Sequence, residues 1–383
     1  MKKKLLFING HLNTGGVEKS LVDVLRHLDY DRYEVDLLLL EGLGDYASQL
    51  PSQVNVILHS LENTYGAFVP CLLRCLKRRD WFSLRMRLIF LEQKLFGMHR
   101  LSDAKKMLTG NKHYDCVIGF RSGVCTQVAS FAVDADRRIA WWHHGEVNVT
   151  DTYLREVSNC QAIAVVSESC KQMLIAHFPA LEEKLVVVSN MIDAEGIKEK
   201  AAQFEPYAGK TGVQIISVGR LAPEKHFENA IYAASQLKVK GIVFQWHLVG
   251  DGVMRPMLEQ RIRELGGEDS FILEGNQANP YPYMKYADLF VHPSYVESQG
   301  IVVLEALALG VPCVVTKSLG PCEFIVDGVN GVLAEQSDID LAEKVYGVIC
   351  TQDLMKTLQR QSGLPADYAT TLVSKKVESI LLG

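Results

Sequence analysis

Short apolar runs alternate with longer amphipathic segments along the whole chain, a pattern typical of α/β proteins with parallel strands. In the first half, the apolar runs predict buried strands over 4–8, 35–40, 54–58, 116–120, 138–142, 162–166 and 186–188. Apolar residues recur at helical spacing over 15–28, which predicts a helix directly after the first strand. Residues 67–109 also read as helix.

The same pattern restarts in the second half. Strands are predicted over 213–218, 243–249, 270–274, 289–292, 311–316 and 331–333, with a helix over 226–238 and a polar linker at 207–210. We therefore expect two Rossmann-like α/β domains with a cleft between them. The first comprises residues 1–190 and the second residues 191–365, and a helix at about 366–383 is expected to pack back on the first.

Composition agrees with a globular protein of this size. The 383 residues are 48% hydrophobic and 22% charged, and the net charge is −5, which excludes a disordered chain and gives no general case for nucleic acid. The apolar run after Lys2–Lys4 is too short for a secretory signal, and no run reaches the ~18 residues of a membrane span. Nine scattered cysteines without a C-x-x-C pair indicate reduced thiols in a cytoplasmic protein.

The most specific motif runs from Pro293 to Ala306 and contains two glutamates, Glu297 and Glu305. A helix that begins near Gly300 places Glu297 in the loop before it and Glu305 inside it. Such a helix start offers free N–H groups to an anion. Glu305 lies in an otherwise apolar helix, where a carboxylate needs partners such as sugar hydroxyls, a backbone group or an arginine. The spacing alone leaves these partners open.

A second motif joins a predicted strand to a helix and carries two cations, Arg220 and Lys225. A guanidinium and an ammonium beside a helix start suit a diphosphate. The alternative is a solvated charge cluster, in which Glu224 neutralises one of the cations.

These motifs occur in a fixed order with several others. The order is Gly219-Arg220, Glu224-Lys225, Val249-Gly250-Asp251-Gly252, Leu273-Glu274-Gly275, Ala287 to Ser294, and then the two glutamates. In this combination the chain resembles the retaining, nucleotide-sugar-dependent glycosyltransferases of family 4, which have the GT-B fold. The resemblance covers the whole chain and is strongest over 213–335. Residues 279–284 resemble a subgroup that often uses UDP-N-acetylhexosamines or UDP-hexoses.

The resemblance implies a role for each matching residue. Arg220 and Lys225 would hold the donor diphosphate, Glu305 the ribose, and Glu297 the transferred sugar. The donor site as a whole would comprise Gly15, Gly16, Gly219, Arg220, Lys225, Gly250, Gly275, Asn276, Glu297, Ser298, Gln299, Gly300, Ile301, Val302 and Glu305. The family usually has an aromatic or aliphatic residue where Gln299 stands, which leaves the identity of the sugar open.

Two further features lie in the first half. The Gly15-Gly16 turn follows the first strand, and in the family this loop faces the donor phosphate and the acceptor, which the N-terminal domain would bind. The segment also imitates a phosphate-binding loop of an NTPase, although Glu18 stands where that loop needs glycine. His143 follows a predicted strand, and the resemblance implies that it lies near the transferred sugar and takes part in catalysis, with His144 as the alternative.

No metal or other cofactor is expected besides the nucleotide-sugar substrate. Asp-x-Asp pairs occur at 29–31, 134–136 and 338–340, but none lies among the donor motifs, and Arg220 with Lys225 can replace a metal ion as charge stabiliser. The sequence predicts a glycosyltransferase that acts in cell-envelope polysaccharide synthesis. The alternatives are a non-catalytic sugar-nucleotide-binding scaffold, a P-loop-like NTPase, and an isomerase or phosphorylase of the same fold.

One segment is strongly basic. Residues 71–106 contain ten lysines and arginines against three acidic residues, interleaved with Trp81 and other large apolar residues. Such a mixture suits an anionic membrane surface, while core helices with a solvated basic face are the structural alternative. We expect peripheral contact with the inner face of the membrane, where a glycan or lipid-linked acceptor would lie.

Overall fold

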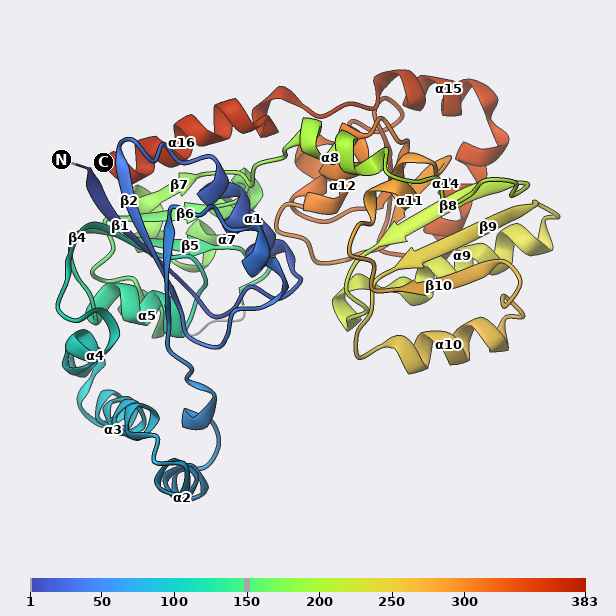
Figure 1. The fold of residues 1–383 in the computed structure, drawn as a ribbon. Helices are drawn as coiled ribbons and strands as arrows, with labels where there is room; N and C mark the ends of the chain where they lie inside the picture. The colour runs from blue at the N-terminus through green and yellow to red at the C-terminus, as the bar shows by residue number, and fades with distance from the viewer. Residues whose placement is uncertain (1, 148–151) are drawn as a thin grey trace. The chain divides into compact units, whose positions relative to one another are not determined.

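The computed structural model describes residues 2–147 and 152–383, which form two α/β units, each built around one parallel sheet (Figure 1). Unit 1 comprises Met1–Met191 together with Val373–Gly383, and unit 2 comprises Ile192–Leu372. The first boundary lies one residue beyond the expected one. The C-terminal segment that belongs to unit 1 lies within the expected range of 366–383.

Unit 1 has a seven-stranded sheet in the order β3-β2-β1-β4-β5-β6-β7. The strands are β1 (Lys3–Asn9), β2 (Tyr33–Leu39), β3 (Val54–Leu58), β4 (His113–Gly119), β5 (Asp134–Trp142), β6 (Ala162–Val165) and β7 (Leu185–Val187). Alternate side chains of β1 enter different cores, with Leu5 and Phe7 on one face of the sheet and Leu6 and Ile8 on the other. Because both faces are covered, the strands read as continuous apolar runs.

The helices of unit 1 cover these two faces. They are α1 (Gly16–Arg26), α2 (Phe68–Arg78), α3 (Trp81–Phe96), α4 (Lys105–Thr109), α5 (Val124–Phe131), α6 (Thr152–Glu156), α7 (Glu168–His177) and α16 (Thr370–Leu382), with short 3₁₀ segments η1 (Asp45–Gln49), η2 (Glu62–Thr64), η3 (Met98–Ala104) and η4 (Pro179–Lys184). Val373 and Val377 of α16 lie in the same core as β1. This contact fixes the C-terminal helix on unit 1.

The single helix expected over 67–109 is wrong in one respect, because the segment is broken twice. Arg79 adopts a left-handed backbone conformation with φ 53°, and Asp80 then caps α3 by accepting a hydrogen bond from the Ser83 amide. Gly97, with φ 109°, ends α3 before η3 begins. The apolar periodicity continues across both breaks, so it concealed them.

Unit 2 has a six-stranded parallel sheet in the order β10-β9-β8-β11-β12-β13. The strands are β8 (Val213–Val218), β9 (Phe244–Val249), β10 (Phe271–Gly275), β11 (Leu289–His292), β12 (Cys313–Thr316) and β13 (Val332–Ala334). The helices are α8 (Ala194–Ala201), α9 (Phe227–Val239), α10 (Arg255–Glu264), α11 (Tyr281–Lys285), α12 (Ile301–Ala308), α13 (Pro321–Phe324), α14 (Asp338–Cys350) and α15 (Gln352–Gln361), with η5 (Pro223–Lys225) and η6 (Ala366–Tyr368).

The segment 207–210 is not the linker that its composition suggested. Tyr207 is buried in unit 2, its ring lies 4.6 Å from that of His247, and its hydroxyl donates to the Tyr283 carbonyl at 2.9 Å. The polar stretch therefore belongs to the packed body of unit 2.

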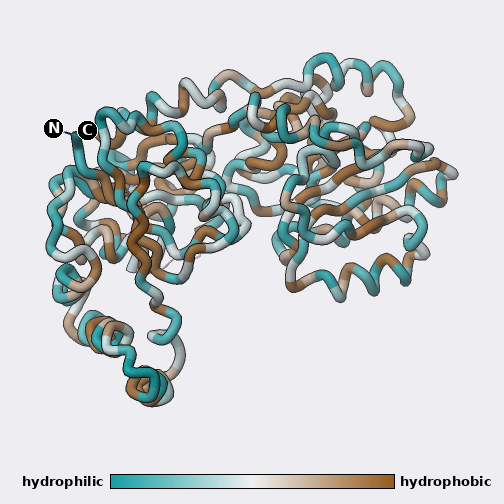
Figure 2. Tube along the Cα trace, in the orientation of Figure 1, coloured by the Kyte–Doolittle hydropathy of each residue, from teal (hydrophilic) through white to brown (hydrophobic). Residues whose placement is uncertain are grey.

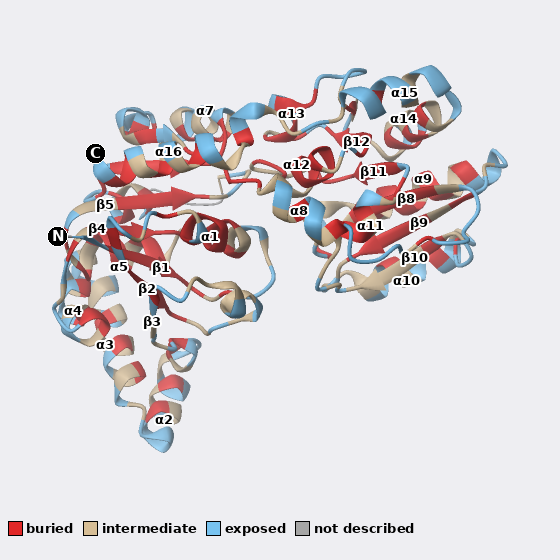
Figure 3. Ribbon diagram, turned by 45° about the horizontal axis from the view of Figure 1, so that its top comes forward, coloured by how far each residue is buried: buried red, intermediate tan, exposed pale blue. Residues whose placement is uncertain are grey.

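Burial follows the same plan in both units: most strands are buried, red in Figure 3, whereas the edge strands β3 and β10 are only partly buried, and hydrophobic colours follow the strands in Figure 2. The apolar strands and the inner faces of the helices form the cores. Within the described residues, no helix is both long and apolar enough to cross a bilayer. All nine cysteines are free thiols, of which only Cys322 and Cys350 are exposed.

Candidate functional site

The strand order of unit 2 places two loops side by side. β8 lies between β9 and β11, so the loop after β8 and the loop after β11 leave adjacent strand ends while the chain order reverses. In open parallel sheets, ligands bind at this reversal, outside the carboxyl ends of the strands. The loop after β8 carries Arg220 and Lys225, and the loop after β11 carries Glu297.

Hydrogen bonds fix the two loops to each other. The Ser294 hydroxyl and the Tyr295 amide both donate to the Glu224 carbonyl, at 3.1 and 3.3 Å. The Tyr295 ring also stacks on the His226 imidazole with a 3.8 Å separation of ring centroids, and the Asn229 amide donates to its hydroxyl at 2.9 Å. Side chains on the two loops are therefore held in a defined relation.

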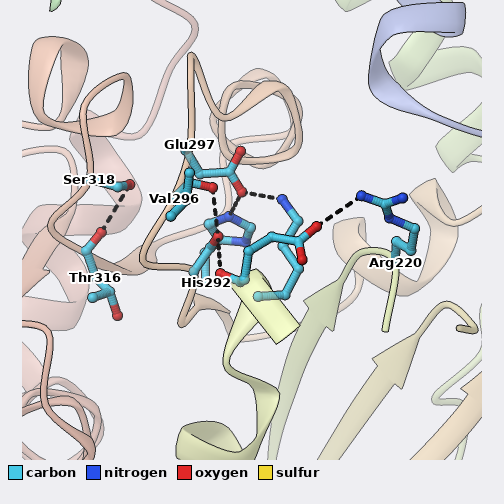
Figure 4. Close-up of polar contacts among 9 residues, drawn as sticks. Arg220, His292, Val296, Glu297, Thr316 and Ser318 are labelled. Carbon is cyan, nitrogen blue, oxygen red and sulfur yellow. Dashed lines mark hydrogen bonds and ion pairs between the residues drawn. The ribbon is translucent and has the colours of Figure 1, made fainter. Parts of the chain in front are cut away.

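Glu297 is the centre of this arrangement (Figure 4). Its Oε1 accepts a hydrogen bond from the Lys225 ammonium and another from His292 Nε2 at 2.7 Å. The side chains of Lys225 and Glu297 are only 19% and 11% exposed, so this pair is shielded from water. It differs in this respect from a surface ion pair.

The environment of Glu297 keeps its carboxyl ionised. Burial by itself would raise the pKa of Glu297, but the positive charge of Lys225 and the hydrogen bond from His292 outweigh it and hold the pKa well below the usual value. A fixed carboxylate in the loop after β11 can accept hydrogen bonds from sugar hydroxyls or stabilise a developing positive charge.

Arg220 is arranged differently. Its guanidinium donates to Glu224 Oε1 at 2.8 Å, but the side chain is 72% exposed. Exposed ion pairs of this kind contribute little to stability and exchange partners easily. Arg220 is therefore available to an incoming anion, although Glu224 holds it in the structure as the alternative interpretation expected.

The predicted glycines bring three strand ends close together. The Gly219 amide donates to the Val249 carbonyl at 3.0 Å, and the Gly250 amide donates to the Gly275 carbonyl at 2.8 Å. Gly250 has φ 141°, and a Cβ there would lie 1.9 Å from the Gly219 carbonyl oxygen. Only glycine allows this approach. Asn276, expected in the base pocket, is exposed directly after this turn.

The helix after β11 begins where the sequence predicted. Gly300, with φ 80°, caps α12, and the amides of Gly300, Ile301 and Val302 lie in the first turn, where a helix has no internal acceptor for them. Ser298 lies just before this turn, and Gln299 is buried. A Cβ on Gly320 would lie 2.2 Å from the Gln299 Cα, so the neighbouring loop packs directly against the helix start.

Glu305 is buried inside α12 and has a partner from the protein. The Tyr281 hydroxyl donates to Glu305 Oε1 at 3.0 Å. Tyr281 begins α11, and its amide is bound by the Asn279 side chain at 3.2 Å. This hydrogen bond satisfies part of the buried carboxylate and sets its orientation.

Unit 1 repeats the reversal of strand order, with β1 lying between β2 and β4. Gly15 precedes α1, and Gly16 is its first residue. Glu18 in the first turn is buried, and its Oε1 lies 3.6 Å from His11 Nδ1. The negative charge of a carboxylate at this helix start would repel a phosphate, which argues against the NTPase interpretation.

A pocket of about 470 Å³ lies at this end of unit 1 and is lined by His11, Asn13, Glu41, Gly42, Glu62 and Tyr65. Its volume is in the usual range of ~300–1,000 Å³ for small-molecule sites. The Tyr65 hydroxyl donates to Glu41 Oε1 at 3.3 Å, and Glu41 Oε2 lies 3.6 Å from His11 Nε2. Carboxylates, a histidine and a tyrosine can all hydrogen-bond a polyhydroxylated ligand.

His143 follows β5, the strand next to β4, and lies against aromatic rings. Its ring is 4.9 Å from Phe120 and 6.0 Å from Trp141, and its Nε2 is buried with no hydrogen-bond partner. Burial, followed by the neighbouring His144, lowers the pKa of His143 to about 3, so the imidazole is neutral at pH 7. His144 is exposed and its Nε2 lies 2.7 Å from the Ser122 hydroxyl.

No metal site emerges from the described ranges, in which no three His, Cys, Asp or Glu side chains gather around a common point. The Asp-x-Asp pairs take part in ordinary contacts, such as Asp134 with Lys105 and Asp340 with the Glu335 amide.

Two residues that the sequence did not single out belong to the site. His292 stood in the quoted motif, but only the structure shows its bond to Glu297. Tyr281 lies in the segment 279–284, which resembles a subgroup of the family. Its hydrogen-bond partner Glu305 is 24 residues away in the chain. His292 could have been identified from the sequence, because it is a polar residue at the end of an apolar strand.

Comparison with known proteins bears on the family and on the fold. Residues 198–362 match the family model of glycosyl transferases group 1. The chain is 32% identical over 149 residues to the lipopolysaccharide core biosynthesis glycosyltransferase LpsE of Rhizobium meliloti, an alignment that covers 39% of this chain and 43% of LpsE. It is 33% identical over 164 residues to the N-acetylgalactosamine-N,N'-diacetylbacillosaminyl-diphospho-undecaprenol 4-alpha-N-acetylgalactosaminyltransferase of Campylobacter jejuni, covering 42% and 43% of the two chains.

Each of these alignments spans less than half the length of the curated relative. A structural match extends further. The Anabaena protein Alr3699/HepE, solved in complex with UDP, superposes with a TM-score of 0.72 over 99% of both chains at 19% identity, which shows the fold. The predicted resemblance is confirmed: residues 198–362 match the group 1 glycosyltransferases, the chain has the fold of solved GT-B glycosyltransferases, and assignment to family 4 is consistent with both findings.

Proposed function

We propose that this protein is a retaining glycosyltransferase. It moves a sugar from a nucleoside diphosphate, a UDP-hexose or a UDP-N-acetylhexosamine, to a hydroxyl group of a glycan or lipid-linked acceptor in cell-envelope polysaccharide synthesis. One observation carries the proposal: two cations, a buried ionised carboxylate and a helix start lie on adjacent loops at the point where the strand order of unit 2 reverses.

The chemistry follows from the charges on these loops. Cleavage of the bond between sugar and phosphate leaves negative charge on the departing diphosphate. Lys225 and the first-turn amides of α12 are held in place beforehand, so they stabilise that charge without reorganising, and the exposed Arg220 turns from Glu224 to join them. Glu305 binds the ribose hydroxyls, and the backbone near Gly275 and Asn276 meets the base.

The sugar side of the reaction involves fewer groups. Glu297 contacts the transferred sugar, and the neutral His143 donates or accepts a hydrogen bond there. Retention follows from attack on the same face that the phosphate leaves, with a departing phosphate oxygen taking the proton of the acceptor hydroxyl. No metal ion is required in this scheme, because the cationic side chains neutralise the diphosphate, and transfer should persist in excess EDTA.

The choice of donor rests on similarity and stays a proposal. HepE was solved with UDP, with UDP and glucose, and with UDP-glucose. The acceptor would enter the pocket beside His11, Glu41 and Tyr65 in unit 1. The reduced cysteines suit action on the cytosolic side, with peripheral contact to the inner membrane face through residues 71–106.

The direct experiment is a panel of UDP-, GDP- and ADP-sugars, with release of nucleotide measured in the presence of candidate acceptors. The product's anomeric configuration is then read by NMR. Lys225→Ala should abolish turnover, whereas Lys356→Ala, a change at an exposed lysine of α15, should not alter it. Near-normal turnover of Lys225→Ala would refute the assignment. UDP binding without any turnover would favour the scaffold instead.

A further inference from the structure

Helix α2 of unit 1 has its large apolar side chains on the outside. Val69, Leu73 and Leu76 follow one another at helical spacing and are 60%, 61% and 45% exposed. The buried face of the helix carries only the small residues Cys71 and Cys75. A soluble helix normally buries its large apolar residues, so this orientation calls for a partner.

Helix α3 has the same feature on a second face. Met86 and Ile89 face the core, while Trp81, Leu91, Leu95 and Phe96 are exposed, three of them by about two thirds. Trp81, Leu91 and Leu95 lie at spacings that return to one side of the helix. In Figures 1 and 3, α2 lies at the end of unit 1 with α3 between it and the sheet. We call these seven exposed residues, Val69, Leu73, Leu76, Trp81, Leu91, Leu95 and Phe96, the α2–α3 patch.

The cations of this segment fall into two groups. Several are occupied within unit 1: Arg74 and Arg87 donate to backbone carbonyls, and Arg100 pairs with Glu92. Lys77, Arg79 and Lys94 are exposed and make no ion pair within the described parts of the chain. Arg78 reaches only the neutral Asn63 side chain, at 3.0 Å. In the chain, Lys77 directly follows Leu76 and Lys94 directly precedes Leu95, so cations without an ion pair adjoin the exposed apolar residues.

We propose that the α2–α3 patch docks unit 1 on an anionic lipid bilayer. The apolar side chains enter the boundary between head groups and acyl chains, Trp81 lies at that boundary, and Lys77, Arg78, Arg79 and Lys94 meet the lipid phosphates. This inference rests on the proposed function only for the reason that the protein would be at the bilayer, which is a lipid-linked acceptor. Docking itself requires no turnover.

Charge distinguishes this partner from a second protein. The core of a protein interface is depleted of charged residues, and its rim carries both signs. Here cations without acidic partners adjoin the apolar residues, which complements a surface that is negative throughout. The patch is smaller than the basic segment 71–106 predicted from the sequence, because several cations of that segment make hydrogen bonds or ion pairs within unit 1.

The test is co-sedimentation of the full chain, without donor, with vesicles of phosphatidylcholine alone or with roughly one third phosphatidylglycerol. We expect binding only to the anionic vesicles. Each cation near such a surface contributes about fivefold, so Lys77→Gln with Arg79→Gln should weaken binding about 25-fold. The matched control, Lys356→Gln with Arg360→Gln on α15, removes the same charge from exposed, unpaired positions and should change binding less than about twofold.

The apolar contribution is tested separately. Leu73→Ser with Trp81→Ser should reduce binding at least tenfold, whereas Val239→Ser with Val253→Ser, at positions 81% and 83% exposed elsewhere, should not. Circular dichroism verifies that all variants are folded. The proposal is overturned if the wild-type chain does not bind anionic vesicles, or if each patch variant and its matched control lose binding equally. It is also overturned if the patch forms a dimer interface that Leu73→Ser disrupts. Nucleotide release, measured apart, tests the proposed function independently.

Discussion

Nε2 of His292 lies 2.7 Å from Oε1 of Glu297, and the Lys225 ammonium contacts the same oxygen. One carboxylate oxygen is thus fixed by a ring at the end of β11 and by a charge in η5. The His292 ring is 1% exposed and lies nearly parallel to Phe290, and its Nδ1 is buried without a hydrogen-bond partner. The imidazole therefore acts through Glu297, as a positioning residue.

His292→Phe should reduce turnover while leaving the donor KM almost unchanged. The ring keeps its packing on Phe290, but Glu297 loses one of its two donors. A hydrogen bond to a charged group contributes about 1.5–3 kcal/mol, which corresponds to a fall of about 10–150-fold in kcat if the transition state uses it. His292→Asn, which can still donate, should recover part of the rate. An unchanged kcat in His292→Phe shows that the contact only stabilises the fold.

Glu305→Ala should weaken UDP binding by at least tenfold, measured by calorimetry, because ribose hydroxyls lose a buried acceptor. Tyr281→Phe removes only the phenol that orients this carboxylate, at 3.0 Å, and should have a smaller effect of a few fold. Glu343→Ala, at an exposed glutamate of α14, is the control for a lost charge. Equal UDP affinity in Glu305→Ala and Glu343→Ala contradicts the ribose assignment.

Gly250→Ala should destabilise unit 2 by more than about 3 kcal/mol, because the new methyl group meets the Gly219 carbonyl oxygen at 1.9 Å. Gly310→Ala has a positive φ of 74° but open space, so only the backbone strain of about 1–2 kcal/mol applies. Gly347→Ala, inside α14 with nothing within 4 Å, should stabilise the unit by about 0.5–1 kcal/mol. Urea unfolding measures all three, and a different order among them refutes the steric argument.

His143 should make unit 1 less stable in mild acid. Burial and His144 lower its folded pKa to about 3 from 6.5. Below pH 6.5, His143 is protonated in the unfolded chain but stays neutral in the folded chain. The free energy of unfolding therefore falls as the pH drops towards 3. The cost at pH 5 is about 2 kcal/mol. His143→Gln should remove this dependence between pH 7 and 5 in urea titrations, and a variant that keeps the full slope excludes His143 as its source.

Much of the fold could be predicted from local sequence. Strands β3, β8 and β11 have the predicted bounds, and α12 begins directly after Gly300. These features depend on residues close together in the chain: apolar runs buried on both faces of a sheet, and a glycine that adopts a positive φ before a helix. The breaks at Arg79 and Gly97 were missed because hydrophobic periodicity does not register a change of backbone direction.

The sequence by itself determined which residue types were present for the chemistry: two cations after one strand, two glutamates around another helix start, and glycines at the turns. Only the tertiary structure decided their partners. Lys225 and His292 share Glu297 because β8 and β11 are neighbours in the sheet, although Lys225 and Glu297 are 72 residues apart in the chain. The contact between Tyr281 and Glu305 and the outward orientation of the apolar face of α2 likewise depend on the tertiary structure. Strand order and helix rotation arise from packing the whole core, and local patterns do not contain that information.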